Sequence, residues 1–202
     1  MVTPSPPDLR SDPFPVLRTA RLVLRAPMLA DAPALHALRS DERVMRHIGR
    51  PRTTTEEDAV AMLRDVLEQH RTGISLSWAL TLEEGGPLLG TIGYYRVQPQ
   101  HFRGEVGYLL HPDHWGRGLM GEALEAVIGH GFEAIGFHGI EAITDPDNGP
   151  SNRLLEKHGF RREGLIRENY FWNGRFYDSA IWCMLASDRR GADHIALSRT
   201  TT

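Results

Sequence analysis

The segment from residue 105 to residue 135 constrains the fold of this chain most, because its pattern changes from strand to helix across a glycine turn. An apolar run from Val106 to Leu110 predicts a strand buried on both faces. Pro112-Asp113 ends that strand, and Gly116-Arg117-Gly118 forms a tight basic turn. The apolar positions after the turn follow a helical period, so we expect a helix from Leu119 to about Ile135.

The turn before this helix has the properties of an anion-binding site. The first N–H groups of a helix lack intrahelical partners, and the helix dipole adds partial positive charge there. Gly116 and Gly118 lack side chains that would keep a diphosphate from the backbone, and Arg117 adds a cation. The motifs G-K-[ST] and G-x-G-x-x-G are absent, so this is neither a Walker loop nor a dinucleotide fingerprint. On the glycines alone, an ordinary strand–helix connection explains the pattern equally well.

The rest of the chain predicts strands and helices on both sides of this unit. Asp31 is a candidate N-cap for a helix ending at Ser40, and Thr54 with Glu57 forms a capping-box signature. The strand at 140–144 follows the central helix, so it should be a parallel neighbour of the strand at 106–110. Asn173-Gly174 is a strong hairpin signal. The other predicted strands cover 21–26, 74–82, 88–97, 165–172 and 176–185, and a short helix covers 150–159.

Length and composition indicate one soluble domain. The chain has 202 residues, with 41% hydrophobic and 24% charged residues. A net charge of −3 gives no argument for binding to nucleic acid or membranes. The single cysteine, Cys183, excludes an intrachain disulfide, and no signal peptide is recognisable, so we expect a cytoplasmic protein. We expect a domain at 16–186, a flexible proline-rich tail at 1–15 and a polar tail at 187–202, in a monomer or homodimer.

Two motifs resemble those of one enzyme family. His114-Trp-Gly-Arg-Gly-Leu-Met-Gly-Glu-Ala123 resembles the acetyl-CoA pyrophosphate loop of the GNAT acetyltransferases, Q/R-x-x-G-x-G/A. Trp115 and Met120 depart from its first and sixth positions, but W-G-x-G-x-M is similar to the branch that contains the Rim-type ribosomal-protein N-terminal acetyltransferases. Asn148 and Ser151, before a short helix ending in Gly159-Phe160, resemble the second motif. The resemblance covers about residues 17–185.

The resemblance implies an α/β (α+β) GNAT fold, in which helices flank a mixed, strongly curved sheet. It implies acetyl-CoA as cosubstrate and no metal. It also implies a gap beside the strand ending at His111, where a backbone N–H could hold the thioester oxygen. The predicted cofactor-binding residues are Leu109, Leu110, His111, Trp115, Gly116, Arg117, Gly118, Leu119, Met120, Gly121 and Asn148.

The reaction that the resemblance implies is direct transfer of an acetyl group to a primary amine. An ammonium of pKa ~10 must lose a proton, and Glu105 is the candidate base, with a salt bridge or a structural hydrogen bond as the alternative. Ser151 could orient the thiol or relay a proton, or be only a helix cap. Leu155 occupies the place of the tyrosine that is the acid in many relatives.

The acceptor is not predicted beyond a protein N-terminus or a small-molecule amine. We interpret Arg46, Arg50 and Arg52 as a solvated basic loop, with recognition of an acidic acceptor as the alternative. A non-catalytic acyl-CoA-binding or sensing protein on the same scaffold is the alternative function. A third possible function is that of a module that serves chiefly to bind other proteins.

Overall fold

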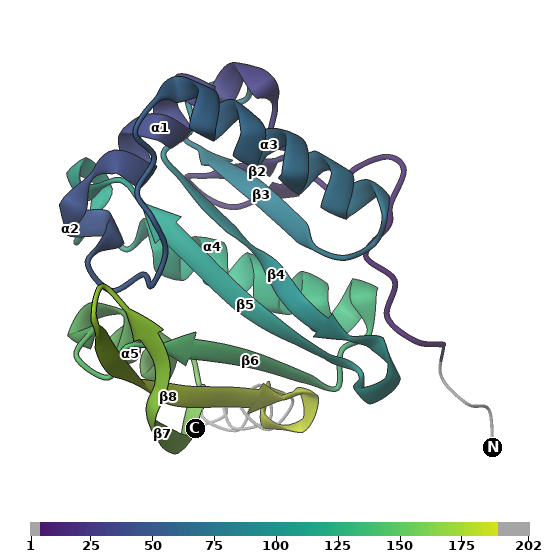
Figure 1. Ribbon diagram of the computed structural model, residues 1–202. Helices are drawn as coiled ribbons and strands as arrows, with labels where there is room; N and C mark the ends of the chain where they lie inside the picture. Colours follow the sequence, from purple (N-terminus) through teal and green to yellow (C-terminus); the bar gives the residue numbers. More distant parts are fainter. Residues whose placement is uncertain (1–4, 190–202) are drawn as a thin grey trace, which may run out of the picture.

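A computed structural model describes residues 5–189, and it has one eight-stranded sheet with helices on both faces (Figure 1). The sheet order is β1-β2-β3-β4-β5-β6-β8-β7. Its strands are β1 (Leu17–Arg18), β2 (Val23–Arg25), β3 (Leu76–Thr81), β4 (Gly90–Gln98), β5 (Arg103–Leu110), β6 (Gly139–Thr144), β7 (Arg161–Trp172) and β8 (Arg175–Leu185). Its α-helices are α1 (Ala32–Ser40), α2 (Glu42–Met45), α3 (Glu56–Arg71), α4 (Leu119–His130) and α5 (Gly149–Lys157).

Short helical turns complete the connections. The 3-10 turns are η1 (Leu29–Asp31), η2 (Pro99–His101) and η3 (Pro112–His114), and a π-helical turn, η4 (Gly131–Ile135), continues α4. The helix predicted for 119–135 is therefore present, with a wider last turn. A side chain at position 131 would collide with the hydroxyl of Tyr94, which donates a hydrogen bond to the Val127 carbonyl at 2.7 Å. The close approach of this helix to β4 thus depends on Gly131.

The predicted parallel neighbours, β5 and β6, are confirmed. They are the one parallel pair in a sheet whose other adjacent strands run antiparallel, so the predicted mixed sheet is confirmed as well. Their pairing covers only three positions: Arg103 with Gly139, Gly104 with Ile140, and Glu105 with Glu141. Beyond Glu105 the two strands diverge (Figure 1).

Two buried clusters hold the layers together. The larger lies between the sheet and α4, and it contains Trp78, Tyr94 and Leu124. The smaller lies under α1, α2 and α3 and contains Leu38 and Leu63. These helices therefore cover the opposite face of the sheet from α4, as predicted for a sheet flanked by helices. Within residues 5–189 no helix combines the length and the apolar character needed to cross a bilayer.

Two predicted caps were wrong in detail. The capping box of α3 is formed by Thr55 and Asp58, one residue later than Thr54 and Glu57. Asp58 is the better partner because its Oδ2 accepts from the N–H groups of both Thr54, at 2.7 Å, and Thr55, at 3.0 Å. Asp31 stands at the N-cap of α1, but its side chain makes no capping hydrogen bond.

Asp31 instead forms a buried ion pair. Its two carboxylate oxygens accept from the Arg25 guanidinium at 2.7 and 2.8 Å and from the Met28 N–H at 2.9 Å. The side chains of Arg25 and Asp31 are only 11% and 5% exposed. A buried guanidinium without its carboxylate is costly, so this pair fixes the start of α1 against β2.

We expect Asp31→Ala to lower the free energy of unfolding by about 3 kcal/mol, because it leaves the Arg25 charge buried and unpaired. Urea unfolding measures this loss. Asp8→Ala removes the carboxylate of an exposed pair with Arg10, whose side chain is 65% exposed, and should have a much smaller effect. Equal losses in the two variants would contradict a structural role for the buried pair.

The predicted division into a domain with two tails stays a prediction, but part of the expected N-terminal tail contacts the domain. Leu9 is buried in the larger cluster, and the Pro15 carbonyl accepts a hydrogen bond from the Trp78 indole at 2.7 Å. Of the expected C-terminal tail, residues 190–202 lie outside the described residues.

Candidate active site

The wedge between β5 and β6 is the first element of the candidate site. The ladder stops at Glu105 and Glu141, so residues 106–110 have no β6 partner. The sequence did not reveal where the ladder stops; in the structure the last paired positions are Glu105 and Glu141, and the two strands separate beyond them (Figure 1).

The direction of the β5 N–H groups decides which of them face the wedge. The His111 N–H donates to the Leu89 carbonyl at 2.8 Å, on the β4 side. The direction of the N–H groups alternates along a strand. The N–H of Leu109 therefore also points to β4, while those of Tyr108 and Leu110 point away from it. The N–H groups of Tyr108 and Leu110 are therefore the donors available to a thioester oxygen in the wedge. Of the predicted residues Leu109, Leu110 and His111, only Leu110 meets this condition.

The glycine loop lies between β5 and α4. Gly116 and Gly118 have positive φ angles of 70° and 75°, which residues with side chains rarely adopt. Gly118 is the N-cap of α4, so the N–H groups of Leu119, Met120 and Gly121 form its open first turn. The side chains of Leu119 and Met120 are buried, which leaves their backbone as the accessible part. This geometry fits a bound diphosphate.

Gly121 has a different role from the other two glycines. A side chain at Gly121 would lie 2.8 Å from His158 Nε2, whereas nothing lies within 4 Å of one at Gly116. Gly121 is therefore required for the close approach of α4 to the end of α5. Its N–H still belongs to the open first turn.

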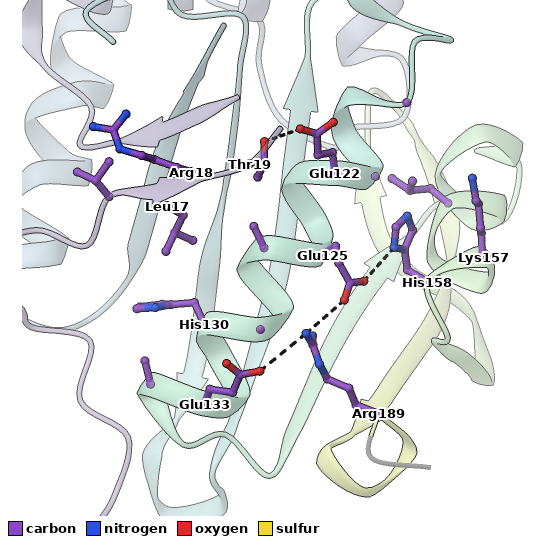
Figure 2. A pocket seen from close by; sticks show the side chains of 17 residues that line it. Leu17, Arg18, Thr19, Glu122, Glu125, His130, Glu133, Lys157, His158 and Arg189 are labelled. Carbon is purple, nitrogen blue, oxygen red and sulfur yellow. Dashed lines mark hydrogen bonds and ion pairs between the residues drawn. The ribbon is translucent and has the colours of Figure 1, made fainter. Parts of the chain in front are cut away.

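Contacts from the N-terminal part of the chain hold the loop in place, and Figure 2 shows the one between Thr19 and Glu122. Arg21 donates to the carbonyl of Arg117 at 2.9 Å and pairs with Glu122 at 2.7 Å. The Thr19 hydroxyl also donates to Glu122. These hydrogen bonds lower the pKa of Glu122, and the one from Thr19 has the largest effect. The side chain of Glu122 therefore stays negatively charged at the start of α4. On the other side of the loop, the Trp115 indole donates to the Leu110 carbonyl at 2.7 Å.

A hollow of about 790 Å³ runs from this loop along the exposed side of α4, between β1 and α5 (Figure 2). Its lining includes Gly118 at one end and Lys157 and His158 on α5. Neither Glu105 nor Ser151 lines it. The hollow therefore adjoins the predicted diphosphate loop and is separate from the predicted catalytic residues.

The start of α5 carries the second motif. Asn148 is the N-cap, and its Oδ1 accepts from the Ser151 N–H at 3.2 Å, so the helix cap is Asn148 and the Ser151 hydroxyl takes no part in it. That hydroxyl lies 2.8 Å from the hydroxyl of Tyr108, so this contact joins α5 to β5. Burial raises the pKa of Tyr108 to about 12, so this phenol stays protonated and can always donate.

Sequence reasoning missed Tyr108, because nothing in the apolar run marked it as the partner of Ser151. Leu155, which occupies the place of the usual tyrosine, is fully buried in the core. Alternation along β5 could have placed Tyr108 on the face opposite Glu105, but it could not have identified the contact with Ser151.

Glu105 lies at the vertex of the wedge, where its side chain is 18% exposed and pairs with Arg96 at 2.9 Å. Arg96 stands in a bulge of β4, with a φ of 44°. Burial raises the pKa of Glu105; Arg96 opposes the shift, and the nearby charge of Glu141 adds to it. A carboxylate with a raised pKa beside a wedge is a candidate base, although it also makes the salt bridge that was the alternative interpretation.

Two histidines near the glycine loop are possible metal ligands. His111 and His114 lie close together, with ring centres 6.3 Å apart. Among residues 5–189, however, no group of three or more potential ligands could hold an ion.

Comparison with known proteins supports the family resemblance. The model of one protein family, the acetyltransferase (GNAT) domain, matches residues 21–161 of this chain. The uncharacterized N-acetyltransferase YoaA of Bacillus subtilis (strain 168) is 34% identical over 172 residues, which cover 85% of this chain and 97% of that protein. A spermidine N(1)-acetyltransferase of Escherichia coli (strain K12) is 24% identical, over 74% of this chain and 78% of its own.

The fold also resembles that of a solved structure with a bound carrier. A ribosomal L7/L12 alpha-N-protein acetyltransferase, RimL, in complex with coenzyme A, superposes with a TM-score of 0.78. The match covers 85% of this chain and 98% of that one, at 20% identity. At this identity the likeness concerns the fold.

Proposed function

Because this chain belongs to the GNAT family and is an acetyl-CoA-dependent N-acetyltransferase, we propose that it transfers acetyl directly to a primary amine at the wedge beside Glu105. The acceptor is a protein N-terminus or a small-molecule amine. The glycine loop holds the diphosphate of acetyl-CoA, and its pantetheine arm enters between β5 and β6. Direct transfer needs no residue of the protein to carry the acetyl group.

In this proposal each residue of the wedge has one task. The Glu105 carboxylate accepts a proton from the attacking amine. The N–H groups of Tyr108 and Leu110 stabilise negative charge on the acetyl oxygen. The new C–N bond forms as the C–S bond breaks, and the Ser151 hydroxyl, oriented by Tyr108, donates a hydrogen bond to the departing sulfur. A thiol of pKa ~8.5 leaves readily as the thiolate, so the missing acid at Leu155 is tolerable.

One observation carries the proposal: the β5–β6 ladder ends at Glu105, within the strand that leads into the glycine loop. The thioester-binding gap, the base and the diphosphate site are thereby built along one continuous segment. Beyond these three positions the backbone groups on the β6 side of β5 have no strand partner, and a pantetheine arm could take the place of the missing ladder.

Release of free thiol from acetyl-CoA, measured with a panel of amines, tests the proposed function. The panel contains peptides with free N-termini, amino acids, spermidine and an aminoglycoside, and mass spectrometry identifies the acetylated product. We expect thiol release that depends on at least one amine. Tight binding of acetyl-CoA without release above the background with any amine would favour the sensing alternative instead.

We expect Ser151→Ala to lower kcat about tenfold, with the KM for acetyl-CoA unchanged, because a hydrogen bond to the leaving sulfur acts in the transition state. The melting temperature should stay the same, since the hydroxyl of Ser151 does not cap α5. Steady-state kinetics and a thermal melt measure the two effects. A lower melting temperature with unchanged kcat would show that the contact with Tyr108 only supports the fold.

A further inference from the structure

Arg39, in the last turn of α1, is a partly buried cation without a partner. Its Nε is buried and makes no hydrogen bond within the described residues. No carboxylate between residues 5 and 189 forms an ion pair with it, although ion pairs up to 3.9 Å are present elsewhere. Burial lowers the pKa of Arg39, which reflects the cost of holding this charge away from water. Proteins seldom leave a buried guanidinium in this state without a use for it.

Arg50 lies in the loop between α2 and α3, which the Thr53 N–H ties to the Arg39 carbonyl at the end of α1. The charge of Arg50 lowers the pKa of Arg39 further, after the effect of burial. Arg50 is exposed and, like Arg39, has no carboxylate partner in the part of the chain that the structure describes. Guanidinium groups without a carboxylate partner are suited to bind an anion, because each offers several N–H donors in a fixed fork.

The nearby carboxylates are engaged with other partners. Glu105 pairs with Arg96 at 2.9 Å, and Asp145 with His47 at 2.8 Å. Glu42 is the carboxylate closest to Arg52, at 3.6 Å, and that pair lies at the surface. Within residues 5–189, therefore, no carboxylate forms an ion pair with Arg39 or Arg50.

The two arginines lie on the same side of the sheet as Glu105. Tyr95 and Glu105 are paired across β4 and β5, so their side chains point to the same face. Burial raises the pKa of Tyr95, while a hydrogen bond with Ser77 and then the charges of Arg39 and Arg50 lower it. The charge of Arg50 also lowers the pKa of Glu105, after the larger effects of burial and Arg96. The neighbouring residues of β5 agree with this placement: Val106 packs in the cluster under α4, whereas Leu109 packs against the cluster under α1, so Glu105 points to the face that α1 covers.

The loop that carries Arg50 is held on two sides. The Thr53 N–H donates to the carbonyl of Arg39 at 3.3 Å, which ties the loop to α1. At the other side, a side chain on Gly49 would lie 2.6 Å from the ring of Tyr170, so the β7–β8 hairpin packs directly against the loop. Figure 1 shows the tip of this hairpin beside the loop between α2 and α3. These two contacts hold the backbone of Arg50 in a fixed position.

We propose that Arg39 and Arg50 form a subsite for a carboxylate carried by the acceptor, which places the acceptor's amine at Glu105. This inference rests on the proposed acetyl transfer and names its substrate class: an amine with a carboxylate a few bonds away. Two sources offer this chemistry, a free amino acid and a peptide with an acidic residue at or next to its N-terminus. A polyamine would meet two unpaired cations at the same place, so spermidine is disfavoured.

Matched acceptors that differ in one charge test the subsite. One arm compares free amino acids with their amides, and the other compares peptides that begin Ser-Asp with peptides that begin Ser-Asn. We expect kcat/KM to be roughly tenfold to a hundredfold higher for the acidic member of one pair, as for other hydrogen bonds to charged groups. The arm that shows the preference identifies the source.

The variants Arg50→Gln and Arg39→Met should each reduce the ratio of kcat/KM between the acidic and the neutral acceptor to near one. Arg50 is exposed, so its variant should fold even if the Arg39 variant does not. Arg52→Gln, in the same loop but paired with Glu42, is the matched control and should keep the preference. Acetylation without a preference for acidic acceptors, or a preference that survives Arg50→Gln, would overturn the subsite and leave the proposed function standing. No acetylation of any amine would overturn both.

Discussion

Acetyl-CoA should bind to the Gly118→Val variant roughly a thousandfold more weakly than to the native protein. The backbone N–H groups that follow Gly118 donate to a charged diphosphate in our proposal, and each such hydrogen bond contributes about 1.5–3 kcal/mol. A β-branched side chain at this N-cap would occupy the space in front of those donors. It would also disfavour the φ of 75° that directs them outward. Isothermal titration calorimetry with acetyl-CoA measures the loss.

A matched control separates crowding at the site from backbone strain. Gly136 ends the π-helical turn after α4 with a φ of 82°, and nothing lies within 4 Å of a side chain placed there. Gly136→Val should therefore introduce similar strain, of roughly 1–2 kcal/mol, and lower the melting temperature without changing the affinity for acetyl-CoA. Native affinity in Gly118→Val would remove the argument that the glycine loop holds the diphosphate.

The parts of this site that could be predicted from the sequence are those that local patterns determine. The change of period around Gly116-Arg117-Gly118 identified a strand, a turn and a helix, because each has its own spacing of apolar residues. Asn173-Gly174 marked the hairpin between β7 and β8, because these two residue types accept the positive φ angles that a tight hairpin turn requires. The caps were less accurate: Asp58 replaced Glu57, since one carboxylate could satisfy two N–H groups. Local patterns resolve neighbouring candidates of this kind poorly.

The features that could not be predicted depend on contacts between distant segments. The contact between Tyr108 and Ser151 joins residues 43 positions apart, and the contact between Arg21 and Glu122 joins residues 101 apart. The end of the β5–β6 ladder is likewise a property of two strands together. Arg50 is the clearest case. Its sequence context indicates a solvated basic loop, and only the structure reveals that the Nε of Arg39, on the helix to which this loop is tied, is buried without a partner in the described residues.

For Glu105→Gln, we expect kcat/KM to fall roughly a hundredfold at pH 7, the lower range for loss of a general base. Above the pKa of the acceptor amine the nucleophile is already neutral, so the variant should approach the native rate there. In the native protein the rate should fall on the acid side near a Glu105 pKa that burial raises above its usual value. This acid limb should be absent from the variant. A pH–rate profile of both proteins between pH 5 and 10 measures these differences.

The same pKa shift predicts that Glu105→Gln stays folded. A carboxyl whose pKa is raised in the folded state stabilises the protein below its unfolded pKa, and this stabilisation is lost as the pH rises through the folded pKa. At pH 7 the neutral amide therefore removes a cost, and the melting temperature should not fall. Glu141→Gln, the matched variant on β6, removes a charge that raises the pKa of Glu105, so it should move the acid limb to lower pH and keep the plateau rate. If Glu105→Gln lowers kcat/KM by the same factor at every pH and also lowers the melting temperature, the pair with Arg96 is structural and the base lies elsewhere.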